Sequence, residues 1–325
     1  MSAHLFDMPA DEPQTSPALA ALRPLKISKT QLKLLDFASR QELEDVRENV
    51  GYSPRILAQV SLPYSDPGDV PSWNRTNGHV SISMRPALFK NPDKSEYHAF
   101  AYGLIPRQAL TFFATEAVRT QDPTIVLGRS MREFMLKIGL HSNGRDSGRL
   151  TNQLNRLLGS NLRVEGLLNH ENGHAEKFRQ FYISEGAELW FGKDSNLEDL
   201  NEGLFTSEIT LSSVFFQSII DAPVPVNLDA MRALGSSSMR LDILLWASYR
   251  VYNLNRPQSM RWSELDAQFG GQFSLVRQFK AAFLKNLRAV AIVYPELNFE
   301  VTKDFLILKP SKPMVTPRKR RVELV

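Results

Sequence analysis

The sequence predicts an α+β, mainly helical protein that contains two tandem winged helix-turn-helix domains. Three observations predict this fold class. The order helix, short strand, helix, turn, helix, strand, wing and strand occurs twice, over residues 106–184 and again over residues 238–309. In each copy, the helix after the turn carries several cations. The composition, with 42% hydrophobic and 23% charged residues, is that of a globular protein.

In the first copy, Pro106 suits the first position of a helix whose apolar residues recur at three- and four-residue spacing. A β-type run follows over 124–127. A second helix begins near Ser130 and is capped by Gly139. The third helix spans 146–159, and strands at 162–166 and 177–184 flank a polar wing at 168–176. Upstream, residues 61–78 are predicted to be loop and turn, with a short strand at 79–84.

The second copy repeats this order. A helix spans 241–252, and a short extended run at 259–262 leads to a helix that Ser263 can cap. Gly270-Gly271 forms the turn before a long helix over 273–290. A hairpin around Lys303-Asp304 completes the unit.

These patterns divide the chain into five parts. Residues 1–50 are a flexible arm with a short charged helix near 40–50, and 51–192 are the first winged-helix domain. Residues 193–210 contain the linker, 211–310 are the second winged-helix domain, and 311–325 are a basic disordered tail.

Composition excludes several classes of site. The absence of cysteine excludes disulfides, thiolate metal sites and cysteine nucleophiles. No stretch approaches the roughly 20 apolar residues of a membrane helix, and residues 1–24 do not have the pattern of a secretory signal. A net charge of +4 permits an anionic partner without requiring one.

The long helix of the second copy carries the strongest candidates for DNA contact. Its four cations fall within one broad face, opposite its apolar stripe, and no acidic residue interrupts them. Arginine can bind guanine through two hydrogen bonds, and lysine can pair with phosphate. These cations are Arg277, Lys280, Lys285 and Arg288. Gln272, Ser274 and Gln278 can add hydrogen bonds, and Lys303 in the wing can contact the DNA backbone. A solvated basic surface helix is the alternative interpretation.

The third helix of the first copy carries a second candidate set, with base-reading side chains among its members. This set comprises Arg145, Arg149, Asn152, Gln153 and Arg156. An ordinary surface helix or a protein-binding face is the alternative here. His174 in the wing and the six basic residues of 309–325 are weaker candidates for phosphate contact.

One pattern resembles a catalytic motif. His170, Glu171 and His174 match the H-E-x-x-H pattern of zinc proteases. That chemistry requires both histidines on one face of a helix, whereas here Asn172-Gly173 predicts a turn between strands. We therefore expect a wing tip, no metal, no cofactor and no catalytic residue. A P-loop and a nucleophile elbow are also absent from the sequence.

Long segments of the chain resemble RepA-type plasmid replication initiators, which are Rep proteins that bind repeated sequences called iterons. The matching segments are GYSPRIL (51–57), EAVRT (116–120), IVLGRSMREFMLKIGL (125–140), APVPVNLDAMRAL (222–234), LDILLWASY (241–249), and the runs 262–269, 279–287 and 294–310. One departure concerns the turn before the first recognition helix, where an aromatic residue is expected and Arg145-Asp146-Ser147-Gly148 stand instead.

The resemblance implies a bacterial cytoplasmic protein that is not an enzyme. It implies binding to double-stranded origin repeats, opening of the origin, control of plasmid copy number, and recruitment of the host initiator and the replicative helicase. It also implies a monomer–homodimer equilibrium, with the first domain mediating dimers and DNA backbone contact and the second providing most of the DNA recognition. A winged-helix transcriptional repressor is the main alternative. A zinc peptidase, a strand-nicking nuclease and a protein-only scaffold are further alternatives.

Overall fold

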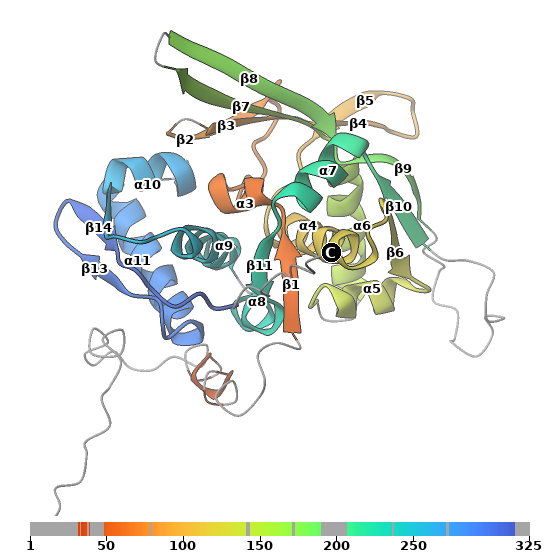
Figure 1. Cartoon of the computed structure of the whole chain (residues 1–325). Helices are drawn as coiled ribbons and strands as arrows, with labels where there is room; N and C mark the ends of the chain where they lie inside the picture. The colour runs from red at the N-terminus through yellow and green to blue at the C-terminus, as the bar shows by residue number, and fades with distance from the viewer. Residues whose placement is uncertain are drawn as a thin grey trace, which may run out of the picture.

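The predicted order of elements occurs in both copies of the repeat (Figure 1). The structure is a computed structural model that describes residues 32, 34–37, 39, 49–78, 80–140, 144–170, 173–189, 207–235, 237–270 and 273–315, with the backbone alone at 144–145, 167–170 and 173–177. Its helices are α3 (Arg55–Gln59), α4 (Leu104–Thr120), α5 (Met131–Lys137), α6 (Gly144–Leu158), α7 (Ser213–Asp221), α8 (Leu228–Leu234), α9 (Ser238–Tyr252), α10 (Trp262–Phe269) and α11 (Val276–Val293).

The strands form five small antiparallel sheets in the described part of the chain. They are β1 (Val50–Ser53), β2 (Trp73–Asn77), β3 (Val80–Arg85), β4 (Ala87–Lys90), β5 (Glu96–Ala99), β6 (Thr124–Gly128), β7 (Asn161–His170), β8 (Gly173–Tyr182), β9 (Ser184–Glu188), β10 (Ser207–Leu211), β11 (Val224–Asn227), β12 (Gln258–Arg261), β13 (Phe299–Val301) and β14 (Phe305–Leu308). The prediction of loop over 61–78 is therefore wrong at β2, which pairs with β3.

The first repeat runs α4, β6, α5, α6, β7 and β8. Ser130 caps α5 by accepting a hydrogen bond from the backbone N–H of Glu133 (3.1 Å). Gly139 follows α5 with a φ of 80°, the left-handed conformation predicted for a capping glycine. The predicted wing over 168–176 is shorter than expected, because β7 and β8 remain paired as far as His170 and Gly173.

The second repeat runs α9, β12, α10, α11, β13 and β14, and its strands form one sheet in the order β12-β14-β13. The prediction that Ser263 caps α10 is wrong, because the helix begins at Trp262 and Ser263 lies inside its first turn. The carboxylate of Glu264 accepts a hydrogen bond from the backbone N–H of Arg261 (2.9 Å), and this contact sets the earlier start. Helix α11 begins at Val276, three residues after its predicted start at Phe273, and continues to Val293.

The strands of the first repeat pair differently. Strands β7 and β8 join β2 and β3 in the order β2-β3-β7-β8, and Figure 1 shows this long hairpin crossing one side of the molecule. Strand β6 pairs instead with β10, which also pairs with β9. Residues 207–210 of the predicted linker are therefore part of a sheet, whereas 193–206 lie outside the described residues.

The two halves of the chain share contacts and one hydrophobic core. Strand β1 pairs with β11, so that Gly51 lies opposite Val226. The core cluster contains buried side chains of both repeats, among them Phe113 and Leu154 from the first and Trp246 from the second. No helix in the described ranges is long and apolar enough to cross a membrane.

Both predicted flexible ends are partly ordered. Leu34 of the predicted arm is 1% exposed, because it packs in the core; residues 1–31 and 40–48 lie outside the description. At the other end, the Tyr294 hydroxyl donates to the carbonyl oxygen of Lys312 (2.7 Å) and accepts from the N–H of Met314 (3.0 Å). These bonds hold the first residues of the predicted tail, whereas 316–325 lie outside the description.

Candidate nucleic-acid interface

Helix α11 separates its apolar and cationic residues onto opposite sides. Phe279, Phe283 and Leu287 are buried, and the Phe283 ring packs at a steep angle to the ring of Trp246 (centroids 6.3 Å apart). The other side of the helix is exposed and carries Arg277, Gln278, Lys285 and Arg288. Because the apolar side is anchored in the core, these polar side chains project into solvent, as the sequence predicts.

Lys280 does not belong to this exposed face. Its Nζ donates hydrogen bonds to the carbonyl oxygens of Thr302 (2.9 Å) and Lys303 (2.8 Å), and it lies 4.7 Å from the centroid of the Trp262 ring. The side chain is half-buried and joins α11 to the turn between β13 and β14. The predicted free cation is therefore a structural residue that positions the hairpin.

Two further predicted residues flank the exposed face. Lys303 is exposed in the turn between β13 and β14, and Ser274 is exposed just before α11, where its hydroxyl donates to the side-chain oxygen of Gln278 (3.2 Å). Gln272 lies outside the described residues. Arg261, at the end of β12, is also exposed, although the sequence pattern did not single it out.

In the first repeat, Arg149 and Asn152 are exposed on α6. Arg149 pairs with Asp146 (3.1 Å), yet its side chain remains 65% exposed. An ion pair this exposed contributes little stability, so the guanidinium can exchange partners at small cost. The side chain of Arg145 lies outside the described residues, although its backbone belongs to α6.

Gln153 and Arg156 point into the protein, contrary to their predicted role. Gln153 is 7% exposed, and its side-chain oxygen accepts a hydrogen bond from the N–H of Tyr102 (2.8 Å). Arg156 donates to the Asp66 carboxylate (3.0 Å) and to the carbonyl oxygen of Phe100 (3.2 Å). Gln153 is buried and the Arg156 side chain is 16% exposed, so both are largely withdrawn from solvent and bond neighbouring loops.

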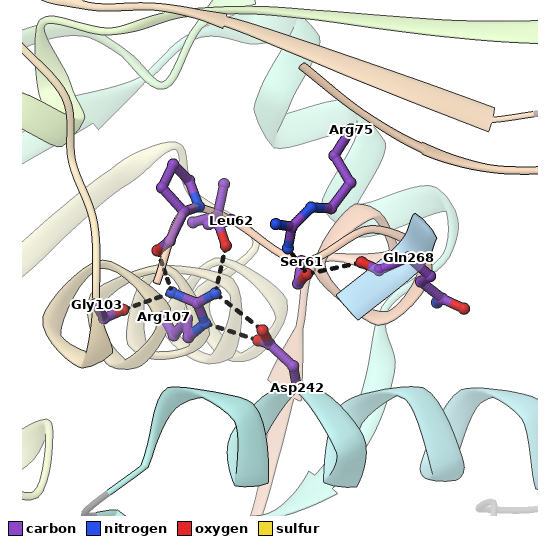
Figure 2. A network of polar contacts seen from close by, with 8 residues as sticks. Ser61, Leu62, Arg75, Gly103, Arg107, Asp242 and Gln268 are labelled. Carbon is purple, nitrogen blue, oxygen red and sulfur yellow. Dashed lines mark hydrogen bonds and ion pairs between the residues drawn. The ribbon is translucent and has the colours of Figure 1, made fainter. Parts of the chain in front are cut away.

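A buried ion pair joins the two repeats (Figure 2). Arg107 of α4 and Asp242 of α9 form two hydrogen bonds of 2.7 and 2.8 Å, and their side chains are 0% and 1% exposed. The same guanidinium donates to the carbonyl oxygens of Leu62 (2.7 Å) and Pro63 (3.1 Å). Burial disfavours the charged form of the Arg107 guanidinium and by itself would lower its pKa. The attraction to the Asp242 carboxylate outweighs this effect of burial, so the pKa of Arg107 is raised.

A second buried arginine extends this network. Arg75 of β2 donates to the hydroxyl of Ser61 and to the carbonyl oxygen of Gly270 (2.7 Å), and Figure 2 shows it beside the first pair. The Tyr64 ring lies near both guanidinium groups, 5.4 Å from that of Arg75 and 4.9 Å from that of Arg107. Burial lowers the pKa of Arg75. This network relates α4 to α9 and α10, and nothing in the sequence pattern marked its members.

The histidine pattern does not form the helical zinc site of a protease. His170 ends β7 and His174 lies in β8, where it is paired with Asn169, and Glu171 lies outside the described residues. The two histidines are therefore on neighbouring strands and not on successive turns of a helix. Among the described residues, no group of three or more His, Asp or Glu side chains is placed to hold a metal ion.

Comparison with known proteins gives one family and one fold. A family model described as "Plasmid encoded RepA protein" matches residues 100–264. No curated protein matches the chain. The crystal structure of selenomethionine derivatives of domains 2 and 3 of RctB is 12% identical, with a TM-score of 0.50, covering 79% of this chain and 98% of the other. A second structure of RctB domains 2–3 is also 12% identical, with a TM-score of 0.43, covering 78% and 96%. The first of these likenesses concerns the fold alone.

Proposed function

Because this chain belongs to the family of plasmid-encoded RepA proteins, we propose that it initiates plasmid replication by binding repeated double-stranded DNA at the origin. One observation supports the DNA-binding part above all others. Helix α11 exposes Arg277, Lys285 and Arg288, has no acidic residue, and begins at Val276, shortly after α10 ends at Phe269. In a helix-turn-helix protein, this second helix enters the major groove.

The sheet of the second repeat supports a winged-helix interpretation. Strand β12 precedes α10, and β13 and β14 follow α11. Strand β14 pairs with both β12 and β13 in one sheet, so the turn at Lys303 between β13 and β14 corresponds to a wing. The first repeat has the same order of elements, but its hairpin is incorporated into a larger sheet with β2 and β3. We propose that the second unit provides most of the base recognition. In the first unit, α6 adds contacts through Arg149 and Asn152.

The proposed mechanism is binding and deformation of DNA without covalent chemistry. The two helices occupy successive major grooves of one repeat, and several copies on adjacent repeats bend the origin and favour strand opening. The opened origin then receives the host initiator and the replicative helicase. The proposal places this activity in the bacterial cytoplasm, with monomers and homodimers in equilibrium.

A binding titration tests the proposal. Full-length protein is titrated against DNA from its own replicon and against random duplex, at two salt concentrations. We expect a preference of ~10³-fold or more for a repeated origin segment, and a decrease in affinity as salt rises. Equal, weak binding to both duplexes would contradict specific recognition.

A transcriptional repressor would use the same α11 face, so DNA binding alone does not separate the two functions. A plasmid that carries the origin but lacks the gene separates them, with the protein supplied from a second replicon. Maintenance of that plasmid supports initiation. Repression of a reporter without maintenance supports the repressor.

A further inference from the structure

A cavity that the proposed DNA contacts do not use lies between α4, α5 and α8. It has a volume of about 260 Å³. Helix α4 belongs to the first repeat, and α8 lies just before the first helix of the second, as Figure 1 shows. The cavity is therefore located where the two halves of the chain meet.

The α4 wall of the cavity is unusually polar for a buried helix. Gln108, Thr111 and Thr115 recur at three- and four-residue spacing, so they share one face of α4, and all three are at most 6% exposed. The Gln108 side-chain oxygen and the Thr111 hydroxyl have no hydrogen-bond partner. Because buried polar groups are nearly always bonded, two such groups on one cavity wall indicate that a polar ligand completes them.

The rim of the cavity is cationic. Arg119, Lys137 and Arg232 line it, and Glu116 is the one acidic residue in the described lining. Each cation has an acidic neighbour, and in the case of Arg232 this is Asp229 at 2.8 Å. The side chains of the three cations are 36–49% exposed. Arg119 also donates to the carbonyl oxygen of Val50 (3.0 Å), and Lys137 donates to that of Leu127 (3.1 Å). Arg232 is therefore the rim cation that an incoming anion can attract at the smallest cost, because its exposed ion pair contributes little stability.

The rest of the lining is apolar and includes Phe112, Ile138 and Met231. The cavity exceeds the ~150 Å³ that accommodates benzene and lies just below the ~300–1,000 Å³ typical of drug-sized ligands. We propose that this cavity binds a small organic anion. An apolar ring packs on the Phe112 side, the Thr111 hydroxyl donates to an oxygen of the ligand, and a phosphate or carboxylate contacts the rim cations.

Isothermal titration calorimetry on the full-length chain, without DNA, tests this site with four probes. Phenyl phosphate and benzoate each combine a ring with an anion, and comparing the two separates phosphate from carboxylate. Phenol lacks the anion, and inorganic phosphate lacks the ring. We expect saturable 1:1 binding of phenyl phosphate or benzoate, with phenol and inorganic phosphate at least about tenfold weaker. If inorganic phosphate bound as tightly as the ring anions, the proposal would be overturned. It would also be overturned if neither ring anion bound at about 10 mM, a concentration at which weak ligands still bind.

Two variants locate the site, and a third is the control. Thr111→Val replaces the unpartnered hydroxyl with a methyl group of the same shape, so folding is preserved. Arg232→Gln removes one rim cation, and Arg55→Gln removes an exposed arginine that does not line the cavity. We expect Kd of the bound ring anion to rise about five- to tenfold in the first two variants and to stay unchanged in the third. Unchanged binding in both cavity variants would refute the assignment. Since no DNA is present, this outcome is independent of the proposed DNA recognition.

Discussion

Arg277 and Lys280 lie one turn apart on α11 but have different environments. Arg277 is exposed, whereas Lys280 bonds two carbonyl oxygens of the β13–β14 turn and lies over the Trp262 ring. Substitutions at the two positions should therefore separate DNA affinity from stability. A sequence pattern of cations on one helix face cannot distinguish these roles, because both residues lie within the same broad arc.

We predict that Arg277→Ala weakens binding without lowering the free energy of unfolding. If Arg277 reads a base, the loss should be about 1–3 kcal/mol at one position of the repeat. If it meets phosphate alone, the loss should be similar on all sequences, with a shallower salt dependence. Fluorescence titration and urea denaturation measure the two quantities, with Arg55→Ala as the control. Unchanged affinity for origin DNA would contradict the placement of α11 in the groove.

Lys280→Ala should lower the free energy of unfolding by about 1–2 kcal/mol, because it removes two hydrogen bonds and a cation–π contact. The same urea denaturation measures this change. Affinity for DNA should fall as well, because the wing at Lys303 loses its attachment to α11. If Lys280→Ala had the same free energy of unfolding as the natural chain, the hydrogen bonds from Lys280 to the β13–β14 turn would contribute nothing to stability.

Asp266 predicts a pH dependence of stability. Burial raises the pKa of Asp266, Arg75 offsets part of this effect, and Oδ1 of Asp266 has no hydrogen-bond partner. A carboxyl group whose pKa is raised in the folded state stabilises the fold below its unfolded pKa, and this contribution is lost as pH rises through the folded pKa. Asp266→Asn should therefore remove that pH dependence and be more stable than the natural chain at neutral pH.

Urea denaturation over the range in which carboxyl groups titrate measures this effect. Asp69→Asn is the matched control, because Asp69 is exposed in a loop and should leave the profile unchanged. Identical profiles for Asp266→Asn and the natural chain would rule out the burial of Asp266 as a cost to stability.

The buried ion pair between Arg107 and Asp242 links helix α4 to helix α9. We predict that Asp242→Asn costs about 3–5 kcal/mol of unfolding free energy, because it leaves a buried guanidinium without its counter-charge. The double variant Arg107→Met with Asp242→Leu should be less destabilised than the sum of the two single variants, since no buried charge remains.

A double-mutant cycle by chemical denaturation measures the coupling. The exposed pair Lys90–Glu96 supplies the control, and Glu96→Gln should cost about 0–1 kcal/mol. Additive effects of Arg107→Met and Asp242→Leu would show that the pair does not couple the two helices.

The whole molecule should unfold as one unit. The hydrophobic core contains side chains of both repeats, β1 pairs with β11, and Arg107 bonds Asp242 across the halves. We predict a single calorimetric transition with equal calorimetric and van't Hoff enthalpies. Asp242→Asn should shift this transition to lower temperature without splitting it. Two separate transitions would mean that the repeats fold independently.

Local signals in the sequence predicted most helices and the glycine that follows α5, but not the first residue of α4 or the cap of α10. The three- and four-residue spacing of apolar residues placed α4, α6 and α9 to within a few residues, and Gly139 marked the end of α5 because its φ is positive. Helix positions and helix ends depend on residues one or two helical turns away, so a short segment of sequence is enough to predict them. The exposed Arg277 and Arg149 followed from the same periodicity.

Strand partners and buried polar contacts could not be predicted in this way. The pairing of β6 with β10, the inward position of Gln153 and the bonds of Lys280 depend on residues far away in the sequence. The sequence by itself determined which segments are helical and which helices carry cations, because these properties are local. Only the tertiary structure decided which cations remain free for DNA, because burial depends on distant segments that pack against the same side chain.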